Sequence, residues 1–142
     1  MSQITAELTE GTAVRLTDGR HDWVGDEPAE AGGTDTGPDP YELLLSSLAA
    51  CTCVTIAMYC RHKGLVLESI RASYEFDRVH AADCEDCDTR EDGFMERITS
   101  AIRISGDFDE AQRRRLAQIA RRCPVHKTLA NGVTFDDHVT FD

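Results

Sequence analysis

An uninterrupted run of eighteen uncharged residues, Leu43 to Cys60, constrains the fold of this chain more than any other segment. Because 29% of all residues are charged, a charge-free run of this length indicates a segment that is shielded from water. The run is long enough to cross a membrane, but its serines, threonines, alanines and cysteines are more typical of a helix in a protein core. We therefore expect a buried core helix and no membrane span.

The residues around this run predict one helix over residues 40–63. Asp39 supplies an N-cap, Pro40 suits the first helical position, and Gly64 provides the C-terminal stop. Apolar residues then occupy most of the helix circumference. Two adjacent sides carry them: Leu44, Leu48, Cys51, Thr55 and Met58 on one, and Leu45, Ala49, Ile56 and Cys60 on the other. Such a helix needs cover from a sheet on one side and from a second helix or a partner chain on another.

The rest of the chain carries strand and helix patterns in turn. Strands are expected at residues 4–8, 12–16, 20–24, 65–79, 94–105 and 133–141. Asp18-Gly19 marks a hairpin turn, and the Gly- and Pro-rich residues 25–40 read as a long loop. An amphipathic helix is expected at residues 109–122. This order predicts a single α+β domain of residues 1–142 with mainly antiparallel pairing.

The formal net charge of −11 argues against a nucleic-acid partner, because such binding usually requires a basic surface. The N-terminal residues have no basic region followed by an apolar run, so we expect no secretory signal. Six cysteines without such a signal indicate reduced thiols and not a disulfide framework. We therefore expect a cytoplasmic protein with neither a membrane nor a nucleic-acid partner.

Cys123 has the clearest local indication of reactivity. The proline that follows it, Pro124, makes Cys123 the N-cap of a short helix, so backbone N–H groups face its sulfur. Arg121 and Arg122 precede it, and each of these features favours the thiolate and a lowered pKa. The alternative is a small residue at the junction of two helices. His126, three residues on, is interpreted as a hydrogen-bonded structural histidine.

Cys51 lies in the middle of the long helix and by itself reads as a small core residue. No cation is close to it in the sequence, so any activation of its thiol must come from elsewhere in the fold. Cys53 and Cys60 are interpreted as packing residues.

A third group of candidate residues is the acidic stretch that begins at His80 and contains Cys84 and Cys87. Two thiols at C-x-x-C spacing can bind one tetrahedral zinc ion, with His80 as a third ligand. The sequence has no second C-x-x-C, so a closed site would need a distant or intermolecular fourth ligand. The alternative is a solvated acidic loop whose two cysteines have no such role.

Three segments together resemble one family. DEPAEAGGTDTGPDPYELL at residues 26–44, LSSLAACT directly after it and the distant RRCPVHKTL are similar to the OsmC-like branch of the OsmC/Ohr family, thiol-dependent hydroperoxide reductases. The resemblance covers about residues 20 to 140. It implies an intertwined homodimer in which antiparallel sheets wrap around the central cysteine-bearing helices.

The resemblance also implies an activity and a site. It assigns Cys51 as the peroxidatic cysteine and Cys123 as the resolving one. Arg20 is the nearest counterpart of the family's thiolate-holding arginine, and Glu42 stands one position after the family's glutamate. The implied reaction reduces an organic hydroperoxide, uses an external dithiol reductant and requires no metal or organic cofactor.

Two alternatives stay open at this point. One is a redox- or metal-sensing protein that uses His80, Cys84 and Cys87. The other is an OsmC-like dimer whose thiols act on another small electrophile.

Overall fold

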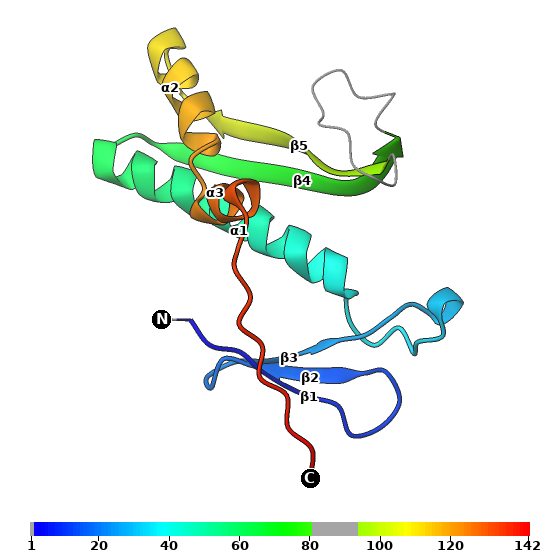
Figure 1. Ribbon diagram of the computed structural model, residues 1–142. Coiled ribbons are helices and arrows are strands. Elements are labelled where there is room, and N and C mark those ends of the chain that lie inside the picture. Colours follow the sequence, from blue (N-terminus) through cyan, green and yellow to red (C-terminus); the bar gives the residue numbers. More distant parts are fainter. Residues whose placement is uncertain (1, 81–93) are drawn as a thin grey trace. The chain divides into compact units, whose positions relative to one another are not determined.

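The computed structural model describes residues 2–80 and 94–142. Its elements (Figure 1) are β1 (Thr5–Glu7), β2 (Val14–Thr17), β3 (Asp22–Gly25), the short 3-10 helix η1 (Ala29–Ala31), α1 (Pro40–Lys63), β4 (Leu67–His80), β5 (Phe94–Gly106), α2 (Glu110–Ala120) and α3 (Pro124–Asn131). The chain divides into two compact units, Met1–Ser46 with Phe76–Glu96 and Ser47–Glu75 with Arg97–Asp142. The predicted α+β class with antiparallel sheets is confirmed.

In the first unit, β1, β2 and β3 form an antiparallel sheet in that order. The predicted hairpin turn joins β2 to β3, with Thr17 opposite Asp22. The carboxylate of Asp18 accepts hydrogen bonds from the backbone N–H groups of Arg20 and His21, at 2.8 and 2.7 Å. An aspartate that binds the backbone of the residues after it stabilises such a turn, which is why Asp18-Gly19 is a usable sequence signal.

The loop before α1 is built around one carboxylate. Asp26 is only 3% exposed. It accepts hydrogen bonds from the hydroxyls of Thr12, Thr34 and Thr36 at 2.7, 2.5 and 2.6 Å. The backbone N–H groups of Glu27 and Thr36 add bonds of 2.8 and 3.1 Å. The three threonine hydroxyls, joined by the Glu27 amide, hold the pKa of the Asp26 carboxyl far below its usual range.

Two glycines let the same loop close on itself. A Cβ at Gly33 would overlap the backbone of Glu27, and a Cβ at Gly37 would overlap the backbone of Val24. Only glycine fits where two backbone segments approach this closely.

We expect Asp26→Asn to lower the urea midpoint of unfolding at pH 7, because an amide cannot accept the same five donors. A carboxyl with a lowered folded pKa adds stability above its unfolded pKa of about 3.9, and that stability is lost as the pH falls further. The midpoint should therefore change less between pH 7 and pH 3 in the variant than in the wild type. Asp35→Asn is the matched control, since it removes one charge from the same loop at a residue whose positive φ of 53° asparagine also tolerates. Equal acid sensitivity in both variants would contradict the assignment.

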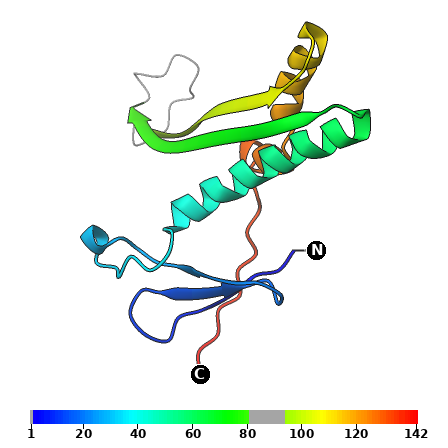
Figure 2. The same ribbon diagram turned by 180° about the vertical axis from the view of Figure 1, so that it is seen from behind.

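The second unit contains the apolar core. Ile56 and Cys60 on α1 pack with Phe108 and with Leu116 and Ile119 on α2. Partly buried side chains surround them: Tyr59, Leu65, Leu67, Ile70, Ile102, Ile104 and Ala120. In both ribbon views, α1 runs along β4 and β5 (Figures 1 and 2). Burial raises the pKa of the Cys60 thiol, so its interpretation as a packing residue agrees with its position.

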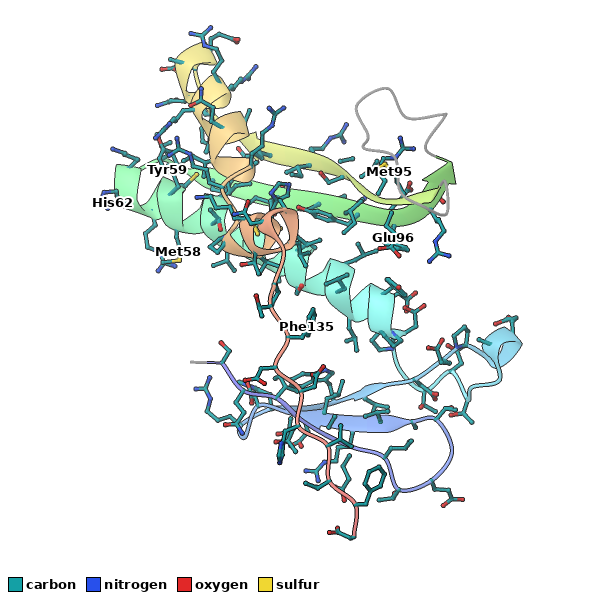
Figure 3. All side chains as sticks on the ribbon, viewed as in Figure 1. Met58, Tyr59, His62, Met95, Glu96 and Phe135 are labelled. Atoms are coloured by element: carbon teal, nitrogen blue, oxygen red, sulfur yellow. The ribbon has the colours of Figure 1, made fainter. Side chains whose placement is uncertain are left out.

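The bounds of α1 match those expected. Its buried residues form a single stripe at four-residue spacing: Leu48, Thr52, Ile56 and Cys60. Other apolar side chains of this helix are exposed in the single chain, with Val54 at 54% and Met58 at 61%. In Figure 3, Tyr59 and Met58 leave α1 on different sides, and the Tyr59 ring centroid lies 6.0 Å from the guanidinium carbon of Arg115.

By length and composition, α1 is also the one helix among the described residues that could cross a membrane. Its most apolar window has a mean hydropathy of 1.9 and is 22% buried. The core helix of a soluble protein meets the same criteria, so this finding alone is weak evidence for a membrane span.

The expected strand at residues 133–141 is wrong, because residues 132–142 have no regular secondary structure. Val133, Phe135, Val139 and Phe141 follow the alternation of a strand, yet all four are exposed. Phe135 lies on this segment after α3 (Figure 3). Alternation defines a face, but a strand also needs a neighbour for its backbone hydrogen bonds. Within the described part of the chain, no strand pairs with this segment.

Candidate active site

The sulfur of Cys123 lies at the start of α3. Cys123 is the N-cap of this helix, Pro124 follows at its first position, and the backbone N–H of His126 donates to Cys123 Sγ at 3.5 Å. Cys123 is 0% exposed. The N-cap role that the Cys-Pro sequence predicts is therefore confirmed.

Cys51 on α1 meets Cys123 although the two are far apart in the sequence. Their side chains hydrogen-bond each other, and both are free thiols. Cys51 is half-buried, whereas Cys123 is fully buried. The structure thus brings together the two thiols that the sequence analysis selected, with Cys51 the more accessible of the pair.

The surroundings of the two thiols move their pKa values in opposite directions. Burial raises the pKa of Cys51, and its hydrogen bond with Cys123 raises it further. Burial also disfavours the Cys123 thiolate, but hydrogen bonds from Cys51, from the His126 amide and from the Thr52 hydroxyl outweigh it and lower the pKa of Cys123. The Val125 amide contributes in the same direction.

Two hydroxyls next to the thiol pair were missed by sequence reasoning. Thr52 Oγ1 and the Tyr74 hydroxyl lie 2.7 Å apart, and Thr52 also hydrogen-bonds Cys123. Thr52 is 1% exposed, on the buried stripe of α1 between Leu48 and Ile56. A polar residue on an apolar stripe is the sequence signal that could have found it, because a buried hydroxyl needs a partner.

Arg20 and Glu42 belong to the first unit, whereas both thiols belong to the second. Arg20 lies in the β2–β3 turn. Glu42 forms a capping box at the start of α1: its carboxylate accepts the Asp39 N–H at 2.9 Å, and its own N–H donates to Asp39 Oδ1 at 2.8 Å. Glu42 therefore has a structural role, and the catalytic roles of Arg20 and Glu42 stay predictions.

Glu42→Gln separates these two roles. Glutamine preserves a capping box, as Gln112 does with Asp109 at the start of α2. We expect Glu42→Gln to keep the wild-type melting temperature and Glu42→Ala to cost about 1 kcal/mol of stability, from the lost hydrogen bond. If the carboxylate charge also orients Arg20, as the family resemblance implies, Glu42→Gln should lower the hydroperoxide reduction that the same resemblance implies, while leaving stability unchanged. Turnover unchanged in Glu42→Gln would leave Glu42 with the capping role alone.

The expected zinc ligands lie largely outside the described residues. His80 ends β4, and Cys84 and Cys87 fall in residues 81–93. In the described ranges 2–80 and 94–142, no three His, Cys, Asp or Glu side chains are grouped so as to hold a metal ion. Zinc binding by His80, Cys84 and Cys87 stays a prediction.

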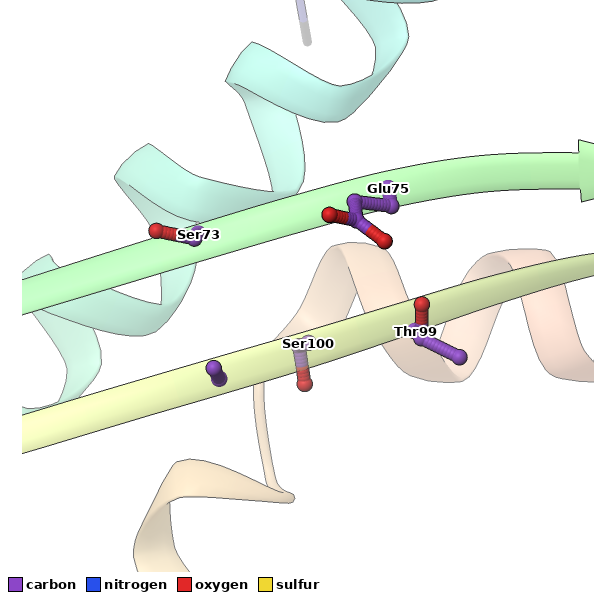
Figure 4. A pocket seen from close by; sticks show the side chains of 5 residues that line it. Ser73, Glu75, Thr99 and Ser100 are labelled. Atoms are coloured by element: carbon purple, nitrogen blue, oxygen red, sulfur yellow. The ribbon is translucent and has the colours of Figure 1, made fainter.

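A shallow depression lies on β4 and β5 (Figure 4). It is lined by Ser73, Glu75, Thr99, Ser100 and Ala101. It is open to solvent, and its lining contains neither a thiol nor a cation. We assign no chemistry to it.

A family model described as "OsmC-like protein" matches residues 33–136. The chain belongs to the OsmC-like family. The match includes Cys51, Cys123 and the whole of α1. A comparison with curated proteins finds no match.

Solved structures agree with the fold of this OsmC-like chain. An OsmC-like protein from Mycoplasma pneumoniae is 24% identical, with a TM-score of 0.71 over 92% of this chain and 87% of that one. The organic hydroperoxide resistance protein OsmC from Legionella pneumophila is 22% identical, with a TM-score of 0.62 and coverages of 89% and 87%. The organic hydroperoxide resistance protein OhrB of Bacillus subtilis is 21% identical, with a TM-score of 0.58 and coverages of 89% and 88%. The expected OsmC-like fold is thus confirmed.

Proposed function

We propose that this chain reduces organic hydroperoxides with the Cys51–Cys123 thiol pair. The observation that carries the proposal is the contact between two free thiols, of which the more accessible, Cys51, faces a buried partner with a lowered pKa. Membership of the OsmC-like family supports the same chemistry, since structural neighbours include proteins described as organic hydroperoxide resistance proteins. Reduced thiols suit the cytoplasm, which we propose as its compartment.

In this reaction the Cys51 sulfur attacks the terminal oxygen of the hydroperoxide and the O–O bond breaks. The sulfur is oxidised to a sulfenic acid, and the remaining oxygen leaves as the alcohol. Cys123 then attacks the Cys51 sulfur, so that a disulfide forms and the hydroxyl leaves as water. An external dithiol reduces the disulfide by thiol–disulfide exchange. The cycle needs no metal or organic cofactor.

Apolar side chains near Cys51 support an organic substrate. Val54 and Met58 follow Cys51 by three and seven residues and therefore lie on the same side of α1. Both are exposed. An alkyl or aryl group gains from burying such surface, whereas hydrogen peroxide does not. We propose that Arg20 stabilises the Cys51 thiolate by opposite charge, with Glu42 orienting it.

The test is oxidation of the reduced protein with one equivalent of cumene hydroperoxide, followed by peptide mass spectrometry under non-reducing conditions. The expected product is a Cys51–Cys123 disulfide with release of one equivalent of the alcohol. Hydrogen peroxide at the same concentration should react more slowly. A disulfide confined to Cys84 and Cys87, or no disulfide at all, would contradict the proposal.

We further propose that the working form is a homodimer. The exposed apolar side of α1 supports this. The single chain buries only one stripe of this largely apolar helix, so the rest of its apolar surface stays exposed unless a partner covers it. The exposed apolar residues of 133–141 support it too, since this segment has the pattern of a strand and lacks a partner in the described chain.

Sedimentation at micromolar concentration should therefore give the mass of a dimer. Phe135→Glu should shift the protein toward monomer by adding charge to the exposed apolar segment 133–141, while Phe135→Leu should not. A stable wild-type monomer would rule out the homodimer.

A further inference from the structure

Charge is divided unequally between the two units of the chain. The first unit, Met1–Ser46 with Phe76–Glu96, contains four arginine or lysine residues and eighteen acidic ones. The second unit, Ser47–Glu75 with Arg97–Asp142, contains eleven basic residues and eight acidic ones. Between residues 97 and 127 the basic residues number eight and the acidic ones only three. A chain with a net charge of −11 thus carries a basic region inside its second unit.

The helix α2 presents part of this basic charge to solvent. Leu116 and Ile119 are the buried residues of α2, so the opposite side of the helix faces away from the core. Arg114 and Arg121 are seven residues apart, which places them on the same side of a helix, and both are exposed. Figure 3 shows nitrogen-tipped side chains around α2.

We name this exposed basic surface the arginine face: Arg113, Arg114, Arg121, Arg122 and Lys127. Arg114 approaches Glu110 at 3.9 Å, but both side chains are well exposed, so this pair contributes little. In the described ranges 2–80 and 94–142, the other four members make no ion pair. The face therefore has uncompensated positive charge to offer a partner.

Neither the helix dipole nor packing accounts for the whole face. Cations stabilise the C-terminal end of a helix, which explains the arginines at the end of α2. Arg113 and Arg114 instead come just after the first turn, where the helix dipole gives a cation no benefit. Their neighbour Arg115 differs from them, because its guanidinium packs 6.0 Å from the ring centroid of Tyr59. Arg113 has no contact of this kind among the described residues.

The arginine face adjoins the segment that carries the buried thiol. Arg122 directly precedes Cys123, and the Lys127 N–H donates to the Cys123 carbonyl oxygen at 3.1 Å. The seven residues from Arg114 to Arg121 extend the face by about 10 Å along α2. A protein bound across this length would therefore lie beside Cys123 and its short helix.

The proposed reaction cycle requires one macromolecule or small molecule besides the peroxide, namely the external dithiol. A basic face is complementary to an acidic surface and speeds the encounter with it. A second copy of the chain would place like charges together if the same face met itself. The eighteen acidic residues of the first unit repel a long nucleic acid. An acidic protein that contacts only the second unit fits this charge distribution best.

We propose that the arginine face is the docking surface for the protein that reduces the Cys51–Cys123 disulfide, and that this protein carries its dithiol within an acidic surface. The inference rests on the proposed peroxide reduction and adds the chemistry of the reductant. It uses only residues of the second unit.

The reduction balances with the partner's dithiol alone. One partner thiolate attacks the Cys51 sulfur, because Cys51 is half-buried whereas Cys123 is fully buried. A mixed disulfide forms, the bond between the two chain sulfurs breaks, and Cys123 leaves as a thiolate. The second partner thiol then attacks the partner sulfur of the mixed disulfide and releases Cys51. Two electrons and two protons pass to the chain, and the partner becomes the disulfide.

Docking would also activate the partner's thiol. Carboxylates around a thiol raise its pKa and lower the fraction of reactive thiolate at neutral pH. Arginine side chains brought next to those carboxylates offset this effect. An acidic dithiol would therefore react faster on this chain than its charge alone allows in solution.

The test compares two synthetic peptides with the same Cys-Gly-Pro-Cys dithiol, one flanked by glutamates and the other by glutamines. All proteins carry Cys84→Ser and Cys87→Ser, so that the C-x-x-C pair cannot react. Diamide forms the Cys51–Cys123 disulfide, which removes any dependence on peroxide turnover. The second-order rate of peptide oxidation is measured, with a small reference disulfide to correct for the intrinsic reactivity of each peptide. The glutamate peptide should be the faster one after this correction.

Arg113→Glu/Arg114→Glu reverses part of the face without altering the residues beside the thiols. It should slow the glutamate peptide by roughly tenfold at low salt and leave the glutamine peptide nearly unchanged. Arg113→Lys/Arg114→Lys retains the charge and should retain the rate. Raising the salt from about 0.01 to about 0.15 M shortens the Debye length from about 30 to about 8 Å. The advantage of the glutamate peptide should shrink in the wild type and change little in the reversed variant.

Arg71→Glu/Arg103→Glu is the matched control, with the same change in net charge in the same unit. Ile70 and Ile102 pack against the core, so the neighbouring Arg71 and Arg103 point to the other face of β4 and β5. This control should reduce the glutamate peptide's rate far less than reversal of the arginine face. If Arg113→Glu/Arg114→Glu does not fold, Arg113→Gln/Arg114→Gln replaces it, with a smaller fall expected.

Three results would overturn the docking proposal: equal corrected rates for the two peptides, equal losses in the two charge-reversed variants, or tight binding of a labelled single-stranded oligonucleotide that only the face variant loses while its peptide rates stay unchanged. Failure of diamide to link Cys51 to Cys123 would overturn both this proposal and the proposed cycle. Charge-dependent reduction without any consumption of cumene hydroperoxide would instead overturn the proposed function and leave the docking surface in place.

Discussion

Cys51→Ser is expected to reduce peroxide consumption to the uncatalysed rate, a loss of about three orders of magnitude or more. A serine hydroxyl in place of the Cys51 thiol cannot form a sulfenic acid, so neither the first oxidation nor the disulfide can follow. The measurement is consumption of cumene hydroperoxide with excess dithiol, under conditions in which the dithiol alone reacts slowly.

Cys53→Ser is the matched control for this result. Cys53 lies two residues on in the same helix and is a half-buried free thiol like Cys51. It does not share the contact with Cys123 that distinguishes Cys51. Turnover near the wild-type rate in Cys53→Ser, with loss in Cys51→Ser, assigns the reaction to one thiol. Comparable loss in both would point to an effect on helix packing and would count against Cys51 as the nucleophile.

Cys123→Ser is expected to abolish multiple turnover while leaving one round of Cys51 oxidation. Without its resolving thiol, the Cys51 sulfenic acid persists, and further peroxide converts it to the sulfinic acid. The observable is a single peroxide equivalent consumed per chain, with a sulfenic-acid adduct trapped on the Cys51 peptide. The sulfinic form should accumulate with excess peroxide.

The opposite pattern would reverse the two roles. Sulfenic acid trapped on Cys123 in Cys51→Ser, with no oxidation of Cys51 in Cys123→Ser, would make the buried cysteine the peroxide-reactive one. Its lowered pKa gives that outcome a physical basis, but its complete burial opposes it. Sustained turnover in Cys123→Ser would contradict a two-cysteine cycle and indicate direct reduction by the external thiol.

The parts of the fold that were predictable depend on local chemistry. The bounds of α1 follow from Asp39 with Pro40 at one end and Gly64 at the other, because caps and stops act within a few residues. The C-terminal segment could not be judged in this way. Its alternation is real, but whether it becomes a strand depends on a neighbour that its own sequence does not specify.

The same distinction between local chemistry and tertiary packing applies to the candidate site. Cys123 could be recognised from the sequence because part of what lowers its pKa is local. It is the N-cap of α3, and the His126 backbone N–H that donates to its sulfur is only three residues on. The contact between Cys51 and Cys123 and the link from Thr52 to Tyr74 depend on packing between α1, β4 and α3, which no local spacing encodes. Resemblance to a family supplied the pairing of the thiols but not the hydroxyls.

The burial pattern of the N-terminal sheet has a consequence for how the protein opens. Among residues 2–46, only Gly25 and Asp26 are buried, so hydrogen bonds and backbone pairing, more than apolar packing, hold this part together in the single chain. Segments with few buried apolar contacts open at a lower free energy than a packed core. Amide hydrogens of β1 to β3 should therefore exchange with deuterium well before those of α2. If a second copy covers this sheet, its protection against exchange will rise with protein concentration, so that assembly and local order become a single equilibrium.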